Sequence, residues 1–535
     1  MLNLVKRETM QGKSAQNGKT VLDTVANNSL ANLTKMGALS ATVFLLPPLL
    51  VRVLDKPTYA TWILILQIGT YVALIDGSIQ LAISRFVARS RGLQDDRYMA
   101  QMLSSAGLIM LAIGLFTALL TLMGSWQLDR LFPGIPQSLG TDARWALLIL
   151  GMSLAISIPF STFAGAFLGL QKHEINAVAG SVGRLAGAAG VAWAAYHHER
   201  LYVMAIWMAT GNLLQGLMYL LAWMRFGMSN LLSVANVKWS AINEFLNFCY
   251  AIFATQLGAV LITGLDMPIV AAFDFHSAAY YAVAATVSTM ISVPQAAIVN
   301  TLIPVASNIG ATGSPERLGH VVLKTTRYAT AILCLIVLPA LLGMYSFLRV
   351  WVGVDYARHA LPIAILLVIA QFVRLTLLPY AAIGFAAGQL NQMLISPVGE
   401  GIMNLLCSLI GVHFFGAIGV ALGTLIGACF GVLLHFINSM PRTNSMTFSR
   451  AGLALNGILK PISLCFPALL LVYFLASHLI SSFIIALLIC FAEILAVLTL
   501  WNLNFNVQER KQLTTLITGM TRRLLIGRFY KATIL

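Results

Sequence analysis

Fourteen long and mostly apolar stretches follow one another along this chain of 535 residues. Each can cross the hydrocarbon core of a bilayer as a helix, which takes about 20 residues. A spanning helix satisfies its own backbone hydrogen bonds, so we predict an all-α integral membrane protein with about 14 transmembrane helices. The last two stretches nearly fuse, which leaves 12 or 13 helices as alternatives. The stretches are residues 30–54, 59–84, 99–126, 144–170, 173–196, 201–226, 244–273, 278–308, 325–351, 360–387, 392–414, 416–439, 457–477 and 479–502.

Basic residues are distributed unevenly between the two sides that such helices create. With the N-terminus in the cytoplasm, 24 of the 33 Lys and Arg residues fall in cytoplasmic segments and seven in outer loops. This asymmetry is the positive-inside rule. It predicts a multi-pass protein of the cytoplasmic (inner) membrane with both termini in the cytoplasm. The formal charge of +15 therefore reflects topology, and we expect no nucleic-acid partner.

The polar residues give no sign of a soluble catalytic or metal site. All six cysteines lie in predicted helices without paired spacing, so we expect free thiols. The nine histidines include no helical His-x-x-x-His pair, and no nucleotide-binding or nucleophile signature is present. We therefore expect no enzyme, no metal and no cofactor. Residues 1–29 lack an apolar core and are predicted to be a cytoplasmic tail.

The chain repeats itself at an offset of about 220 residues. Internal repeats of this kind mark duplicated transporter halves. Each repeat holds six helices, an even number, so both insert in the same orientation. We predict two six-helix lobes related by an axis along the membrane normal. The matching pairs are Pro47 and Pro268, Tyr59 and Tyr280, Arg130 and Arg349, and Gly169 and Gly388.

The repeat gives a predicted domain plan. The N-lobe holds helices 1–6 and the C-lobe helices 7–12, while helices 13 and 14 lie outside the duplication. The predicted boundaries are a tail at 1–29, the N-lobe at 30–226, a linker at 227–243, the C-lobe at 244–439, a linker at 440–456, helices 13 and 14 at 457–502, and a basic cytoplasmic tail at 503–535.

Four segments carry a family resemblance. Residues 45–62 (LLPPLLVRVLDKPTYATW) and 73–88 (ALIDGSIQLAISRFVA) resemble the opening of Wzx-type polysaccharide or O-antigen flippases. Residues 264–270 (GLDMPIV) and 414–421 (FFGAIGVA) are similar to motifs of that family's second half. These flippases belong to the multidrug/oligosaccharidyl-lipid/polysaccharide (MOP) exporter superfamily. Family members more often have twelve helices; two extra helices occur in the lipid II flippase branch, whose N-terminal pattern is missing here.

The resemblance implies a flippase that moves a polyprenyl-diphosphate-linked oligosaccharide across the cytoplasmic membrane by alternating access between two lobes. The product would serve biosynthesis of a surface polysaccharide, namely O-antigen, capsule or exopolysaccharide. Expected partners are the lipid-linked oligosaccharide, membrane lipids, a polysaccharide polymerase and glycosyltransferases. Coupling to H⁺ or Na⁺ is compatible with this mechanism.

Six charged residues interrupt the apolar stretches, and intramembrane charges usually mark a cavity, an ion pair or an ion pathway. The first candidate for binding the diphosphate is Arg184, in the glycine-rich run 180–190. A planar guanidinium bonds two phosphate oxygens and stays charged. The alternative is a structural ion pair with Asp76. The six are Asp76, Arg184, Asp266, Arg374, Glu400 and Glu493.

Arg374 is the second candidate for binding diphosphate or sugar. Its helix is predicted to form a hairpin with that of Glu400, and a structural pair between the two is the interpretation we favour. Asp76 takes part either in ion coupling or in a cap or ion pair, with Gly77 breaking its helix. Asp266 lies near a predicted outer helix end, which favours an interfacial position over a coupling site.

Further polar residues leave two interpretations each. Glu493 belongs to an appended helix, and we predict that it makes a packing or oligomer contact. Arg85 and Arg89 follow the positive-inside rule, or attract anionic headgroups to an entrance. Polar side chains inside apolar helices, such as Gln67, Tyr71, Gln371 and Asn404, bond sugar hydroxyls or join helices to one another.

A cation-coupled multidrug exporter of the same superfamily is the main alternative function. Such a pump favours carboxylates in its cavity, whereas Arg184 and Arg374 favour an anionic substrate. A lipid II-type flippase is a second alternative, and a membrane scaffold without transport is a third. A membrane glycosyltransferase is disfavoured because the outer loops are short and carry no acidic cluster.

Overall fold

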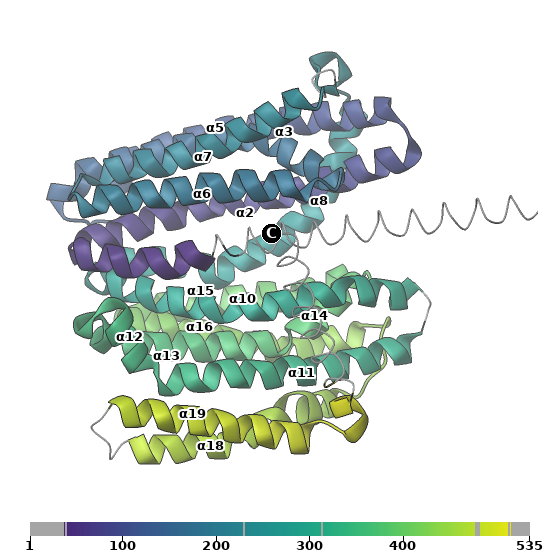
Figure 1. The fold of residues 1–535 in the computed structure, drawn as a ribbon. Helices are drawn as coiled ribbons and strands as arrows, with labels where there is room; N and C mark the ends of the chain where they lie inside the picture. Colours follow the sequence, from purple (N-terminus) through teal and green to yellow (C-terminus); the bar gives the residue numbers. More distant parts are fainter. Residues whose placement is uncertain are drawn as a thin grey trace, which may run out of the picture. The chain divides into compact units, whose positions relative to one another are not determined.

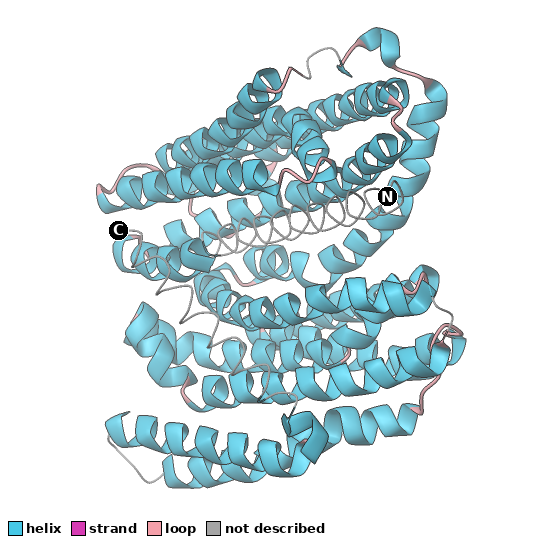
Figure 2. Cartoon of the chain, turned by 45° about the vertical axis from the view of Figure 1, so that its right-hand side comes forward, coloured by secondary structure: helices cyan, strands magenta, loops and turns pink. Residues whose placement is uncertain are grey.

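The computed structural model describes residues 37, 40–227, 231–311, 314–476, 482–511 and 514. This described part is almost entirely helical and contains no strand (Figures 1 and 2). Nine of its helices are long and apolar enough to cross a membrane. The prediction of an all-α integral membrane fold is confirmed. The predicted tail at 1–29 lies outside the described residues.

The chain folds into two compact units. Unit 1 runs up to Thr286 and also includes Trp351–Gly353 and Glu400–Thr424. Unit 2 comprises Val287–Val350, Val354–Gly399 and the chain from Leu425 onward. The predicted lobes, with boundaries at 226, 244 and 439, stay a prediction.

The helices that begin in unit 1 cover its predicted stretches. A first helix spans Ser40–Val53. The others are α2 (Lys56–Leu93), α3 (Asp96–Trp126), α4 (Leu128–Leu131), α5 (Gln137–Gly169), α6 (His173–Tyr196), α7 (Leu201–Arg225), a 3₁₀ turn (Val234–Asn236), α8 (Trp239–Ala259), a π-helical segment (Val260–Gly264), α9 (Asp266–Phe273), α10 (Phe275–Ala311) and α16 (Ala417–Leu434).

The helices that begin in unit 2 complete the set, so the described part of each of the fourteen predicted stretches contains one or more helices. They are α11 (Pro315–Leu342), α12 (Met344–Val352), α13 (Val354–Thr376), α14 (Leu378–Ala386), α15 (Leu390–Phe415), a π segment (His435–Ser439), a 3₁₀ turn (Met440–Arg442), α17 (Arg450–Gly452), a π segment (Leu453–Leu459), α18 (Lys460–Ala476), α19 (Ser482–Thr499) and a π segment (Leu500–Asn504).

Local sequence sets where α2 begins and ends. The Asp55 side chain caps its first turn, and the helix stops where Gln94 adopts a left-handed φ of 53°. Between these points α2 runs unbroken through Asp76 and Gly77, so the predicted break at this dipeptide is wrong. A glycine inside a helix costs only about 1 kcal/mol, which the packing of a long helix readily offsets.

Glycines let the helices of unit 1 approach one another closely. A Cβ added to Gly183 of α6 would lie 2.6 Å from the carbonyl oxygen of Gly211 in α7. A Cβ on Gly169 of α5 would come equally close, 2.6 Å, to the carbonyl oxygen of Ser84 in α2. Small residues at such crossings stabilise helix pairs in membranes. The glycine-rich run of α6 therefore packs on α7.

In unit 2, α18 and α19 pack side by side (Figure 1). Their buried residues join those of α11 in one apolar core, including Cys334 and Leu338 of α11, Cys465 of α18 and Ala496 of α19. The small side chains of Cys334, Cys465 and Ala496 again allow close helix contact. The two appended helices predicted from the sequence therefore share a core with α11.

Candidate functional site

The predicted membrane stretch 244–273 folds as a broken helix. The π-helical segment Val260–Gly264 follows α8, and α9 starts at Asp266. A π segment displaces backbone carbonyls from the regular ladder of an α-helix, so that other groups can reach them. Broken helices of this kind build substrate and ion sites in transporters.

Asp266 is the centre of a polar cluster within unit 1. It is only 5% exposed. Its carboxylate accepts hydrogen bonds from the Tyr281 hydroxyl at 3.1 Å, the Thr424 hydroxyl at 3.0 Å and the Asn404 amide at 3.1 Å. The interfacial depth favoured for Asp266 stays a prediction. Although it stands near a helix end, side chains from α10, α15 and α16 enclose it.

The cluster continues on α15 and α16. The Ser408 hydroxyl lies 3.0 Å from Asn404 Oδ1 and 3.2 Å from the Val420 carbonyl. A carboxylate, an amide, hydroxyls and a carbonyl thus converge, and small hard cations and protons take oxygen ligands of this kind. Within the described residues, no group of three or more His, Cys, Asp and Glu is placed to hold a metal ion. One carboxylate among neutral oxygens suits a monovalent ion or a proton better than a divalent metal.

Polar side chains also bind the carbonyls of the π segment. Asn404 donates to the Ile262 carbonyl at 2.7 Å, and Gln67 of α2 donates to the Gly264 carbonyl at 3.2 Å. The Tyr71 hydroxyl donates to the same Gly264 carbonyl. The structure therefore shows that these three side chains join helices to one another, which is one of the two interpretations given for them above.

Arg184 projects from the middle of α6 and is exposed. It forms no hydrogen bond or ion pair with any residue that the structure describes, and the alternative pair with Asp76 is not formed. Asp76 instead accepts a hydrogen bond from Gln80, one turn along α2, at 2.8 Å. A guanidinium that none of the described carboxylates neutralises is available to an anion.

Arg374 is half-buried on α13 of unit 2 and is oriented by polar neighbours. Its Nη1 donates to Gln371 Oε1 at 2.6 Å, and Gln371 Nε2 donates to Ser292 Oγ at 2.6 Å. Sequence reasoning did not single out Ser292. Glu400, 6% exposed, belongs to unit 1, and its pairing with Arg374 stays a prediction.

Arg85, Arg89 and Glu493 are the remaining predicted residues. The Arg85 guanidinium lies over the Phe248 ring, 4.2 Å from its centroid, and Arg89 pairs with Glu244 at 3.2 Å. That pair is exposed, and exposed pairs contribute only about 0–1 kcal/mol, so it leaves Arg89 accessible to headgroups. Glu493 is half-buried on α19. The roles predicted for Arg85, Arg89 and Glu493 stay predictions.

Long apolar helices, one of them broken, are the architecture of a multi-pass membrane protein. The chain belongs to the polysaccharide biosynthesis protein family, which its sequence matches over residues 22–309. A comparison of its sequence with curated proteins found no match.

Solved structures show the same fold at low sequence identity. The lipid II flippase MurJ in an inward closed conformation superposes with a TM-score of 0.65 at 17% identity, covering 88% of this chain and 97% of that one. An inward-facing multidrug resistance MATE family transporter of the MOP superfamily gives 0.58 at 14% identity, covering 76% and 94%. The Vibrio cholerae MATE transporter VcmN in the bent form gives 0.54 at 13% identity, covering 79% and 97%.

The chain thus belongs to a polysaccharide biosynthesis family and shares its fold with MurJ and with MATE transporters. The resemblance to Wzx-type flippases seen in the sequence agrees with both this family and this fold.

Proposed function

We propose that the protein translocates a polyprenyl-diphosphate-linked oligosaccharide across the cytoplasmic membrane by alternating access, supplying O-antigen, capsule or exopolysaccharide synthesis. The observation that carries the proposal is Arg184, a guanidinium in the middle of a predicted membrane helix and without a partner among the described residues. Keeping such a charge in a membrane helix is costly unless a ligand uses it. A diphosphate matches its planar fork.

Arg374 supplies a second candidate contact for phosphate or sugar. Its hydrogen bond to Gln371, itself bonded to Ser292, holds the guanidinium in one orientation. An arginine fixed in this way loses less side-chain freedom when a ligand binds. Polymerase and glycosyltransferases are the partners that this function requires.

We infer that the Asp266 cluster couples transport to H⁺ or Na⁺. The broken helix brings one carboxylate and several neutral oxygens together in a buried place. Asp76 and Glu400 are the other candidates from the sequence. Asp76 is bonded along its own helix by Gln80, so it is less suited than Asp266.

The proposal is tested by reconstitution. Proteoliposomes would carry a fluorescent polyprenyl-diphosphate-linked sugar, and dithionite would bleach the probe in the outer leaflet only. We expect the purified protein to expose the inner-leaflet probe to bleaching, whereas fluorescent phosphatidylcholine stays protected.

A different outcome would favour the rival function. If the sugar lipid stays protected while the same vesicles accumulate a cationic dye along a cation gradient, the protein is a multidrug exporter. Bleaching of both lipids would indicate leaky vesicles or an unselective scramblase.

Topology is tested by cysteine labelling on both sides of α7. Val234 is 91% exposed in the linker predicted to be cytoplasmic, and Glu199 is exposed in a loop predicted to be outside. We expect a membrane-impermeant maleimide to label Glu199→Cys in intact cells, and Val234→Cys only after lysis. The reverse pattern would overturn the predicted orientation.

A further inference from the structure

Three cavities adjoin one another along the start of α18 in unit 2. A polar cavity of about 380 Å³ lies among α11, the π segment Leu453–Leu459 and the chain around Glu509. It shares Asn456 with a second cavity of about 540 Å³, lined mainly by residues 455–467. The second shares Ile462 and Phe466 with an apolar cavity of about 130 Å³. Polar and apolar spaces thus follow each other along one line.

The polar cavity has a basic wall. His320, Lys324 and Arg327 line it from one face of α11, at spacings of four and three residues. Arg327 is paired with Glu509, whose side chain is only 8% exposed. Lys324 adds a second cation to this wall, with His320 beside it, so the described lining holds two cations and one carboxylate.

Glu509 is held as a fixed part of this wall. Burial acts to raise the pKa of its carboxyl, but the Asn506 amide and the Arg327 charge outweigh this and lower the pKa overall. Because the carboxylate is ionised, it forms an ion pair with Arg327 and holds that side chain in the wall of the cavity. Asn506 and Gln508 add neutral hydrogen-bonding groups to the lining.

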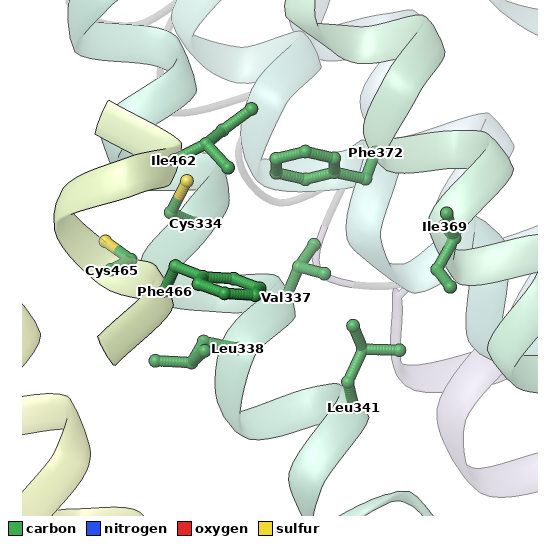
Figure 3. Close-up of a pocket in the computed structure, with 9 residues that line it drawn as sticks. All are labelled: Cys334, Val337, Leu338, Leu341, Ile369, Phe372, Ile462, Cys465 and Phe466. Atoms are coloured by element: carbon green, nitrogen blue, oxygen red, sulfur yellow. The ribbon is translucent and has the colours of Figure 1, made fainter. Parts of the chain in front are cut away.

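The far end of the line is apolar. Figure 3 shows Val337 and Leu341 of α11, Phe372 of α13 and Phe466 of α18 around this cavity. Along the middle cavity, Leu459 and Phe466 are each 53% exposed. Exposed apolar side chains on a membrane helix face hydrocarbon, so this end of the line is open to lipid chains.

We propose that this line of cavities binds one anionic glycerophospholipid, with its phosphate beside Lys324 and His320 and an acyl chain along α18 toward Phe372. Basic pockets between membrane helices on the cytoplasmic side recognise anionic headgroups. This end of α11 is predicted to be cytoplasmic. A polar cavity of about 380 Å³ accommodates a small headgroup and not an oligosaccharide, so the occupant is a bilayer lipid and not the transported glycan.

The test uses the full-length protein in detergent and follows its melting temperature. Dioleoylphosphatidylglycerol is expected to raise it, and dioleoylphosphatidylcholine to leave it nearly unchanged. The double variant Lys324→Gln with His320→Gln should bind phosphatidylglycerol at least about fivefold more weakly, because it loses the attraction of the basic wall. Arg317→Gln, on the same end of α11 but outside the cavity lining, is the matched control and should respond like the wild type.

Two further probes separate lipid from free anion. Inorganic phosphate alone and dihexanoylphosphatidylglycerol, whose chains are too short to follow α18, should stabilise the protein much less than the long-chain lipid. An equal phosphatidylglycerol response in the double variant, an equal response to phosphatidylcholine, or full stabilisation by phosphate alone would each overturn the proposal. None of these outcomes bears on Arg184 or on flipping of the sugar lipid.

Discussion

Replacing Arg184 by alanine is expected to reduce export of the lipid-linked glycan by about 100-fold or more. Two charge-assisted hydrogen bonds to a diphosphate contribute about 1.5–3 kcal/mol each. A loss of about 3 kcal/mol corresponds to roughly two factors of ten. Arg184→Lys keeps the charge but loses the fork, so an intermediate defect is expected. Surface glycan, measured in cells that depend on this protein, reports the effect.

The structure makes this experiment easy to interpret. Arg184 has no ion pair among the described residues, so its removal leaves no buried carboxylate behind. We expect the melting temperature of Arg184→Ala to stay near that of the wild type, because breaking a buried pair would instead cost about 3–5 kcal/mol. Leu185→Ala, the exposed neighbour on α6, is the matched control and should export normally. Normal glycan in a stably expressed Arg184→Ala protein would exclude the proposed role.

The fold could be predicted from the sequence because the bilayer allows few alternatives. A long apolar stretch in hydrocarbon has to be helical, and the described part of every predicted stretch contains one or more helices. The ends of the helices were harder to predict. α2 runs on to Leu93 and α11 already begins at Pro315, since their polar and basic ends extend beyond the apolar stretch. Hydropathy detects the part of a helix inside the membrane and not its full length.

The candidate sites could be predicted only in part. Asp266 was noticeable because a carboxylate in an apolar stretch is rare, but its partners Tyr281 and Thr424 carry no charge and were missed. Asn404 and Ser408 stand four residues apart, so one face of their helix was recognisable as polar. Which helix that face meets depends on tertiary packing, which a single sequence does not contain.

Arg184 illustrates the same limit. The glycine run around it was correctly associated with close helix packing, and Gly183 indeed meets Gly211 of α7. Whether Arg184 pairs with Asp76 or stays available to a ligand depends on how the helices pack, which the sequence does not show. Asp76 turned out to be bonded by Gln80 on its own helix.

Substituting Asp266 by asparagine is expected to abolish the dependence of flipping on a cation gradient. Asparagine keeps the size of the side chain and one acceptor oxygen but removes the negative charge that attracts H⁺ or Na⁺. A ligand that binds only the folded state at 100 times its Kd stabilises it by about 2.7 kcal/mol. If Na⁺ is the coupling ion, it should raise the melting temperature of the wild type above that in K⁺ at equal ionic strength. The asparagine variant should lose this difference.

Asp266→Ala separates coupling from structure. Without the carboxylate, Asn404 still reaches the Ile262 carbonyl and Thr424 still reaches the Val420 carbonyl. We therefore expect a loss of stability of only about 1–3 kcal/mol, the usual cost of one unsatisfied buried polar group. Thr424→Val is the matched variant: it removes one neutral oxygen and should weaken the ion response without abolishing it. If Asp266→Asn flips the sugar lipid with an unchanged response to both Na⁺ and pH, the cluster only holds helices together.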